Sequence, residues 1–429
     1  MRGIVLLLAF GLATTKAAAQ DQLTGAWSGY WFRAGDSLAI TLHIKRDPAT
    51  RAPSATFDSE RLRVLGIPFA EVKTEGCCNV SMRLTGDRTT TLFTGTVRGS
   101  TFSGEFREGE VAGRFAYTRV RGPSTALIER EVTFANGDVK LAGTLILPSS
   151  GGKHPAVVFV HGSGAEGRWA SRFLAVSFAN RGVAALIFDK RGVGGSTGNW
   201  RTASLADLAG DAAAAIAYLA LDDHIDPKRI GIHGHSQGGT LAPMIAARSN
   251  GVAFLIASAA SGVPTDPTEI FSVLNSILPN ASTATDSAAA RTYVSALVAA
   301  AYHGGPRDRV DALIAQFKDR AWYFAPPPPD ASYWTFSREF AAYKALDWWS
   351  LVRVPVLLIY GAADQRVPAT ESAARIAAEL LRQSPNADVT VRILPEADHT
   401  FRLPAGPSGW PVTAPDYLPT LWNWVGARR

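Results

Sequence analysis

Short apolar runs that alternate with helical patterns constrain the fold of this chain more than any other feature of its sequence. The runs cover residues 155–162, 183–190, 229–236, 252–259, 354–361 and 388–394. They have the length of strands and are rich in Val, Ile, Leu and Ala. Continuous apolar strands separated by helices indicate a parallel sheet covered on both faces. The sequence therefore predicts an α/β fold, which begins with a hairpin around Asn136-Gly137-Asp138.

The hundred or so residues before this pattern have a different texture. Residues 22–122 contain short strand-like stretches separated by turn residues. Apolar side chains recur at every second position, as at Leu38, Ile40, Leu42 and Ile44. This period of two is typical of a half-buried strand. We therefore expect an antiparallel β-domain of barrel or sandwich type.

A long insert separates two strands of the expected parallel sheet, between Ser261 and Leu351. Inserts of this length are more often lids or caps than passive loops. The insert has helical stretches and many aromatic residues, including Trp322, Tyr323, Phe324, Tyr333, Trp334, Phe336, Phe340, Tyr343, Trp348 and Trp349. They could line a substrate site, although each taken singly is better explained as part of the cap's own core.

The N-terminus has the features of a secretory signal peptide. Arg2 is basic, an apolar run extends from Ile4 to Leu12, and small residues stand at Ala17 and Ala19. The run is shorter than the roughly 20 residues that a membrane-spanning helix needs. We expect cleavage near Ala19 and export to the periplasm or the medium.

These patterns together divide the chain into four parts. The expected parts are a signal peptide over 1–19, a β-domain over 20–125 and a catalytic domain over 126–429, with a cap inserted at about 262–350. No later stretch is long and apolar enough to span a bilayer. The sequence leaves the oligomeric state and the use of the β-domain open.

The charge pattern limits the expected partners. The formal net charge is +6, but Lys and Arg are scattered and form no basic stripe interleaved with aromatic residues. We therefore expect no nucleic-acid partner. The two cysteines, Cys77 and Cys78, are neighbours and do not have zinc-ligand spacing. A pair of thiols and a vicinal or intermolecular disulfide fit them about equally well.

Two serines lie in the pattern Gly-x-Ser-x-Gly, Ser236 and Ser196. Ser236 follows a strand-like run and precedes a helical pattern, and Gly234 and Gly238 leave room for a tight turn. A nucleophile on a strand-to-helix turn needs such small neighbours. Ser196 lies in a glycine-rich loop with no helix at its flank. The context therefore favours Ser236 as the nucleophile.

The other two members of a catalytic triad should follow Ser236 in the order acid, then histidine. Asp364 lies just past the strand after the insert, and His399 just past the last strand. His399 would accept the proton of Ser236, and Asp364 would hold the imidazole. Asp398 is a rival acid, but adjacent residues rarely point toward each other, so Asp364 is preferred.

An oxyanion intermediate would need preorganised hydrogen-bond donors. The backbone N–H of Gln237 is one candidate. The other is expected in the loop after the strand at 155–161, at Ser163, which Gly162 and Gly164 flank. Glycines on both sides would let this backbone approach the substrate.

Five motifs then make the chain from about Glu129 to Arg429 resemble an α/β-hydrolase. They are HGSG at 161–164, FDKRGVGGST at 188–197, GHSQGG at 234–239, GAADQRVP at 361–368 and DHTF at 398–401. The region is similar to exported bacterial esterases and to the serine aminopeptidase-like branch with a helical cap. The resemblance implies that Asp189 and Arg191 shape a loop near the site and that Ser196 is not a nucleophile. We expect neither a cofactor nor a metal.

The leading hypothesis is an exported serine hydrolase that cleaves carboxylic esters of apolar acyl or aryl groups. A peptidase of the same fold is the alternative, with Glu339 or Asp347 binding the amine of a short peptide. A metal-dependent hydrolase would use the pair His233 and His235, but no further ligand cluster follows at suitable spacing. The remaining alternative is a binding protein, in which the β-domain holds a ligand or an envelope partner and the hydrolase unit is inactive. Every expected catalytic part is nevertheless present in order.

Overall fold

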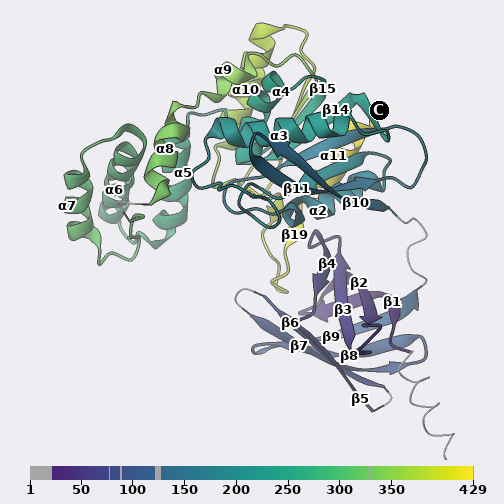
Figure 1. The fold of residues 1–429 in the computed structure, drawn as a ribbon. Coiled ribbons are helices and arrows are strands. Elements are labelled where there is room, and N and C mark those ends of the chain that lie inside the picture. The colour runs from purple at the N-terminus through teal and green to yellow at the C-terminus, as the bar shows by residue number, and fades with distance from the viewer. Residues whose placement is uncertain (1–21, 77, 87–88, 121–126, 329–330, 429) are drawn as a thin grey trace, which may run out of the picture. The chain divides into compact units, whose positions relative to one another are not determined.

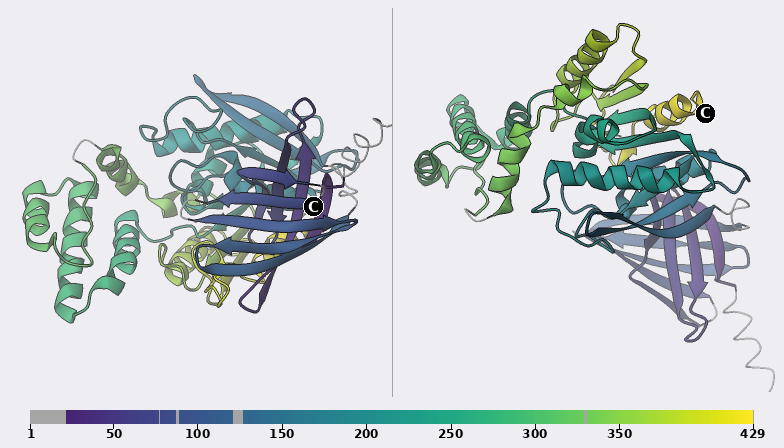
Figure 2. Two further views of the ribbon diagram at one scale, coloured as in Figure 1. Left: turned by 90° about the horizontal axis from the view of Figure 1, so that it is seen from below. Right: turned by 45° about the horizontal axis from the view of Figure 1, so that its top comes forward.

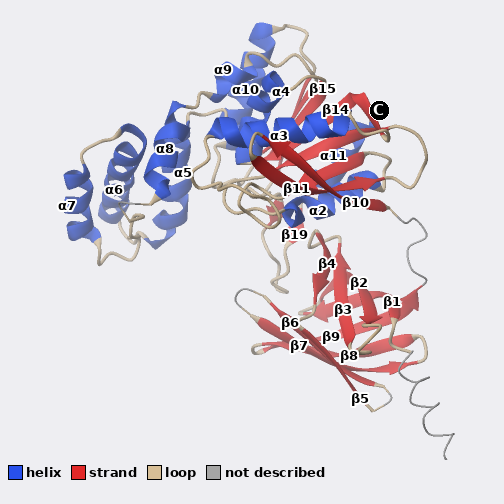
Figure 3. Ribbon diagram, viewed as in Figure 1, coloured by secondary structure: helices blue, strands red, loops and turns tan. Residues whose placement is uncertain are grey.

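The computed structural model describes residues 22–76, 78–86, 89–120, 127–328 and 331–428. The expected signal peptide therefore lies outside the described residues. The chain separates into two compact units. One contains the residues up to 126 together with 405–412, and the other contains 127–404 and 413–429. Figure 3 shows that the first is built of strands and the second of strands and helices.

The first unit is one antiparallel sheet curved into a half-barrel (Figure 1). Its strand order is β4-β3-β2-β1-β9-β8-β7-β6-β5. The strands are β1 (Gly25–Arg33), β2 (Asp36–Arg46), β3 (Pro53–Ser59), β4 (Val64–Pro68), β5 (Glu71–Glu75), β6 (Asn79–Thr85), β7 (Thr90–Arg98), β8 (Thr101–Glu108) and β9 (Val111–Val120). The first strand of this sheet, β1, pairs with the last, β9. The two ends of the stretch 25–120 therefore meet in the middle of the sheet.

The inner face of the half-barrel holds an aromatic core. The four alternating residues of β2 that predicted a half-buried strand are all buried, with exposures of 2% or less. They pack with a set of large rings that includes Trp27, Trp31, Phe57, Phe93, Phe102 and Phe115. Cys78 is disulfide-bonded, and Cys77 lies outside the described residues.

Segment 405–412 completes this core, although the sequence prediction placed it with the catalytic domain. Trp410 is buried against Phe106, and the guanidinium of Arg33 lies 4.8 Å from the Trp410 ring. Ser408 Oγ donates a hydrogen bond to Asp36 Oδ2 over 2.7 Å. The half-barrel is therefore built from two distant parts of the sequence.

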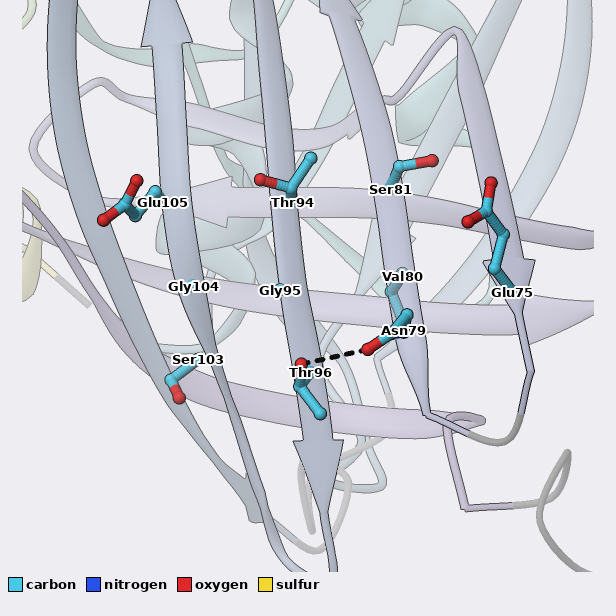
Figure 4. A pocket seen from close by; sticks show the side chains of 10 residues that line it. All are labelled: Glu75, Asn79, Val80, Ser81, Thr94, Gly95, Thr96, Ser103, Gly104 and Glu105. Carbon is cyan, nitrogen blue, oxygen red and sulfur yellow. Dashed lines mark hydrogen bonds between the residues drawn. The ribbon is translucent and has the colours of Figure 1, made fainter.

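The outer face carries an open, polar hollow (Figure 4). Gly95 and Gly104 pair across β7 and β8 beneath it. A Cβ on Gly95 would lie 2.5 Å from Ser103 O of β8 and 2.6 Å from the Phe115 ring, so only glycine fits here. Around the glycines lie Ser, Thr and Asn side chains, and Thr96 Oγ1 bonds Asn79 Oδ1 over 3.1 Å.

The second unit contains an eight-stranded mixed sheet, as the apolar runs predicted. Its order is β10-β11-β13-β12-β14-β15-β16-β17. The strands are β10 (Ile128–Asn136), β11 (Val139–Leu147), β12 (His154–Val160), β13 (Ala184–Phe188), β14 (Ile225–His235), β15 (Val252–Ser258), β16 (Val356–Gly361) and β17 (Val389–Leu394). The pairs from β13 to β17 are parallel, and β10 and β11 form the predicted hairpin.

Helices cover both faces of this sheet (Figures 1 and 2). One face packs against α3 (Leu205–Ala220), α4 (Gln237–Arg248) and α10 (Ala369–Gln383). The other packs against α2 (Arg172–Ala179), which follows the 3-10 turn η1 (Arg168–Ser171), and against α11 (Tyr417–Gly426). A short ladder pairs β18 (Arg402–Leu403) with β19 (Val412–Thr413). The α/β-hydrolase expectation is thereby confirmed.

The insert between β15 and β16 forms a helical cap, seen at the left of Figure 1. It contains α5 (Thr265–Ile277), η2 (Leu278–Asn280), α6 (Ala284–His303), α7 (Arg307–Phe317), α8 (Ser332–Ala342) and α9 (Ala345–Trp349). Of the aromatic residues singled out in the sequence, those from Trp322 to Trp334 pack in the cap's own core, and those from Phe336 to Trp349 pack on the core of the sheet. These aromatic residues therefore contribute to packing. The apolar substrate that their number suggests stays a prediction.

Candidate active site

Ser236 occupies a strained turn between β14 and α4. Its φ of 55° and ψ of −116° lie in a region that residues with a Cβ rarely adopt. A Cβ on Gly234 would lie 2.3 Å from the carbonyl carbon of Gly238, and one on Gly238 would lie 2.5 Å from Val160 O. Only glycine fits at these two positions, so the surrounding packing holds the strained serine at the end of the strand.

The structure brings Ser236, His399 and Asp364 together in one hydrogen-bonded chain. His399 Nε2 lies 3.0 Å from Ser236 Oγ, and His399 Nδ1 lies 2.7 Å from Asp364 Oδ2. The other oxygen of Asp364 accepts hydrogen bonds from the N–H groups of Arg366 and Val367 at 2.7 and 2.9 Å. The buried carboxylate is therefore fixed in place, and it can fix the histidine in turn.

The two rival residues do not join this chain of bonds. Asp398 Oδ1 accepts from the backbone N–H groups of Thr400 and Arg402 and so closes its own turn. Ser196 is buried, where its Oγ donates to Asp189 O over 2.7 Å and accepts from Ala142 N over 3.0 Å. The side chains of Asp398 and Ser196 therefore form hydrogen bonds with backbone groups and not with His399.

The expected oxyanion loop lies against the elbow. A Cβ on Gly238 would be 2.6 Å from His161 O, so the backbone before Gly162 contacts the first turn of α4. Gln237 is the first residue of α4, so its backbone N–H belongs to the unpaired end of that helix. Ser163 is exposed in the loop, and Gly164 adopts a φ of 89°. This placement is compatible with the two donors that the sequence predicts.

The loop over 188–197 is held by buried ion pairs. Asp189 accepts from Arg168 Nη2 over 2.9 Å and from Gly195 N over 2.9 Å. Arg191 binds both carboxylate oxygens of Asp211 at 2.7 Å. Asp189 and Arg191 thus shape the loop internally.

Sequence reasoning missed two charged residues beside the oxyanion loop, Lys190 and Glu166. Lys190 Nζ donates to Gly162 O and Gly164 O, and Glu166 Oε2 accepts from Gly162 N. The available signal was a lysine two residues after an apolar strand, which is unusual for a residue type that is seldom buried.

The His233 and His235 side chains bond different partners. His233 Nε2 lies 3.1 Å from Ser258 Oγ, and burial lowers the pKa of His233 to about 3. His235 Nε2 lies 3.0 Å from the backbone oxygen of His399, the residue that faces Ser236. Within the ranges that the structure describes, no group of three or more possible metal ligands occurs.

The cap carboxylates proposed for an amine site have other surroundings. Glu339 Oε1 accepts from Leu205 N over 2.7 Å and so holds the start of α3. Asp347 lines the same shallow depression as Glu339. Glu269 on α5, which the sequence did not single out, faces Arg366 of the acid loop. Burial raises the pKa of Glu269, and Arg366 opposes this shift.

Comparisons with known proteins agree with this architecture. The family model described as serine aminopeptidase, S33, matches residues 152–402, more than half of the chain. The quorum-quenching protein AidA of Acinetobacter baumannii is 37% identical over 129 residues, which are 29% of this chain and 42% of AidA. The chain thus spans less than half the length of such relatives.

Two solved structures are similar to part of the chain. Est1E from Butyrivibrio proteoclasticus has a TM-score of 0.42 at 16% identity, over 70% of this chain and 96% of its own. The hypothetical protein PA2218 from Pseudomonas aeruginosa has a TM-score of 0.44 at 19% identity, over 71% of this chain and 91% of its own. Among the helices that the structure describes, none is long and apolar enough to cross a membrane. By the match of its family model, the chain belongs to the serine aminopeptidase S33 family of α/β-hydrolases.

Proposed function

We propose that this protein is a serine esterase that cleaves carboxylic esters through an acyl-enzyme on Ser236. The observation that carries the proposal is the hydrogen-bonded chain from Ser236 Oγ through His399 to Asp364 at 3.0 and 2.7 Å. A serine hydroxyl is a weak nucleophile until a neighbouring base removes its proton. His399 Nε2 stands where it can accept that proton.

The reaction follows from this geometry. Ser236 Oγ attacks the ester carbonyl carbon while its proton passes to His399 Nε2, and Asp364 stabilises the imidazolium through Nδ1–H. The carbonyl oxygen becomes an oxyanion, which the N–H groups of Gln237 and Ser163 would bind. Collapse of the intermediate breaks the bond to the alcohol oxygen, and His399 protonates that oxygen as the alcohol leaves. A water molecule, activated by His399, then hydrolyses the acyl-enzyme.

An ester is preferred to a peptide because of the cap carboxylates. A peptidase that binds a free amine needs an available carboxylate. Glu339 accepts a hydrogen bond from the first residue of α3, and the carboxyl of Glu269 faces the positive charge of Arg366. An apolar acyl or aryl group of modest size remains the proposed substrate, because the cap is rich in aromatic residues.

The test compares two substrate series on the purified mature protein. We expect p-nitrophenyl esters to be cleaved and aminoacyl-p-nitroanilides to be left intact, with release of the chromophore as the readout. An acyl-length series from two to twelve carbons would then locate the preferred chain. Cleavage of the anilides alone would overturn the esterase proposal in favour of a peptidase, and Glu269→Gln would then be the first variant to examine.

We also propose that the protein is exported. The basic start, the short apolar run and the small residues before position 20 support this. Expression with its own N-terminus in a Gram-negative host should yield a periplasmic protein whose mass corresponds to cleavage near Ala19. An uncleaved protein in the cytosol would contradict the proposal.

A further inference from the structure

A buried lysine holds the loop that would bind the oxyanion. Lys190 follows β13 by two residues, and only 3% of it is exposed. Its Nζ donates to Gly162 O over 2.5 Å and to Gly164 O over 2.8 Å. These two carbonyls flank Ser163, the expected second donor of the oxyanion site. Burial of an ammonium is costly unless hydrogen bonds of this kind compensate it.

The lysine therefore controls the direction of one peptide group. The carbonyl and the N–H of a trans peptide point to opposite sides of the bond between them. The carbonyl of the Gly162–Ser163 peptide points to Lys190 Nζ, so the N–H of Ser163 must point away from the lysine. The glycines of this loop have no side chains that could hold it, and Gly164 with its φ of 89° allows other arrangements at little cost.

Glu166 binds the backbone N–H of the same loop. Its Oε2 accepts a hydrogen bond from Gly162 N over 2.7 Å. The negative charge of Glu166 also favours the protonated form of Lys190. One pair of opposite charges thus fixes both the N–H and the C=O of Gly162.

We propose that Lys190, with Glu166 as its counter-ion, is a positioning residue that orients the Ser163 N–H toward the oxyanion. The inference rests on the proposed function and deepens it, since it names the groups that preorganise the site. Lys190 itself touches neither the substrate nor the reacting atoms in this account. It acts through the backbone of Gly162 and Gly164.

The charges around Lys190 predict a pH dependence. Burial lowers the pKa of Lys190 to about 8, and Glu166 opposes this shift. Asp189 is neutralised by Arg168, and burial lowers the pKa of the neighbouring His161 to about 4, so that His161 is uncharged at neutral pH. Other neighbours are the Trp200 ring, whose centroid lies 5.8 Å from Nζ, and Arg191, which is paired with Asp211. Lys190 should therefore lose its charge near pH 8.

The first test is Lys190→Met, which keeps most of the apolar part of the side chain and removes its donors. We expect kcat on a p-nitrophenyl ester to fall about ten- to hundredfold, less than the loss of an oxyanion donor itself, with KM within about threefold of the wild type. Affinity for a trifluoromethyl ketone should fall by a similar factor, because its hemiketal with serine places an oxyanion in the same site. Lys140→Met is the matched control, since its side chain is exposed while its backbone bonds Thr197 of the same loop.

The second test measures kcat as a function of pH and concerns its fall on the alkaline side, the alkaline limb of the profile. In the wild type kcat should fall as Lys190 deprotonates near pH 8, and Lys190→Met should lack this limb. Glu166→Gln keeps an acceptor for Gly162 N but removes the negative charge that favours the ammonium. Because the pKa of Lys190 then falls, the limb should move to lower pH. A purely structural lysine would leave the limb unmoved.

Two results would overturn the inference. One is a folded Lys190→Met variant with wild-type kcat and wild-type affinity for the ketone. The other, which applies even if that variant fails to fold, is an alkaline limb that Glu166→Gln does not shift. Failure of the proposed function is a separate outcome, because it would appear as full ester cleavage by Ser236→Ala with Lys190 intact.

Discussion

Replacing Ser236 by Ala should lower kcat for ester cleavage about a millionfold, since loss of the nucleophile removes the acyl-enzyme route altogether. KM should stay near the wild-type value, because Oγ contributes little to binding of the ground state. Residual activity above the uncatalysed rate would come from the oxyanion donors and from substrate binding. The measurement is steady-state release of p-nitrophenol by freshly purified protein.

Ser196→Ala is the matched control for this variant, since both serines lie in the same Gly-x-Ser-x-Gly pattern. It should keep kcat within about twofold while losing about 1–3 kcal/mol of unfolding free energy, because Ala142 N loses its acceptor. Thermal denaturation separates the two effects. Loss of activity in Ser196→Ala with full activity in Ser236→Ala would reverse the assignment.

Asp364→Asn should lower kcat about 10⁴-fold while the fold is kept. An amide at this position can present its NH₂ group to His399 Nδ1, which favours the imidazole tautomer that cannot accept the proton of Ser236. Kinetics on the same ester at pH 7 would measure the loss.

Asp398→Asn is the control for the acid, because Asp398 adjoins His399 but bonds only its own turn among the contacts described. It should change kcat by no more than about threefold. A larger loss in Asp398→Asn than in Asp364→Asn would show that the rival carboxylate supports the histidine in solution.

The α/β core could be predicted from sequence because its signals are local. A buried parallel strand needs a continuous apolar run, and these runs alternate with helical patterns along the sequence. The elbow was also predictable, since the glycines around Ser236 are required by its own backbone. His399 and Asp364 could be chosen because each lies a few residues past a strand of the same sheet, in the chain order of a triad. The rival Asp398 was set aside because it adjoins His399.

Other features depend on contacts between distant residues. The stretch around Trp410 is rich in Gly and Pro and has the composition of a surface loop, yet Trp410 fills the core of the half-barrel beside Phe106. No local pattern predicts a partner some 300 positions away. Lys190 looked like one more charge in a glycine-rich loop, because the carbonyls that it binds belong to a different loop.

The cap shows a third limit of sequence reasoning. Its aromatic residues indicated an apolar site, but many of them pack in cores, as Trp322 and Trp349 do. The composition gives the number of aromatic rings, but it does not show which face of a helix each ring occupies. Glu339 likewise looked available for a ligand, although it bonds the first residue of α3.

The most direct test of the central claim is covalent labelling of the wild-type protein with a p-nitrophenyl alkylphosphonate, followed by mass spectrometry of the digested chain. The reagent should transfer one phosphonyl group per chain with release of one p-nitrophenol, and the added mass should lie on Ser236. Esterase activity should disappear in proportion to the labelling. A label on Ser196, or full activity in a protein labelled completely at Ser236, would contradict the account.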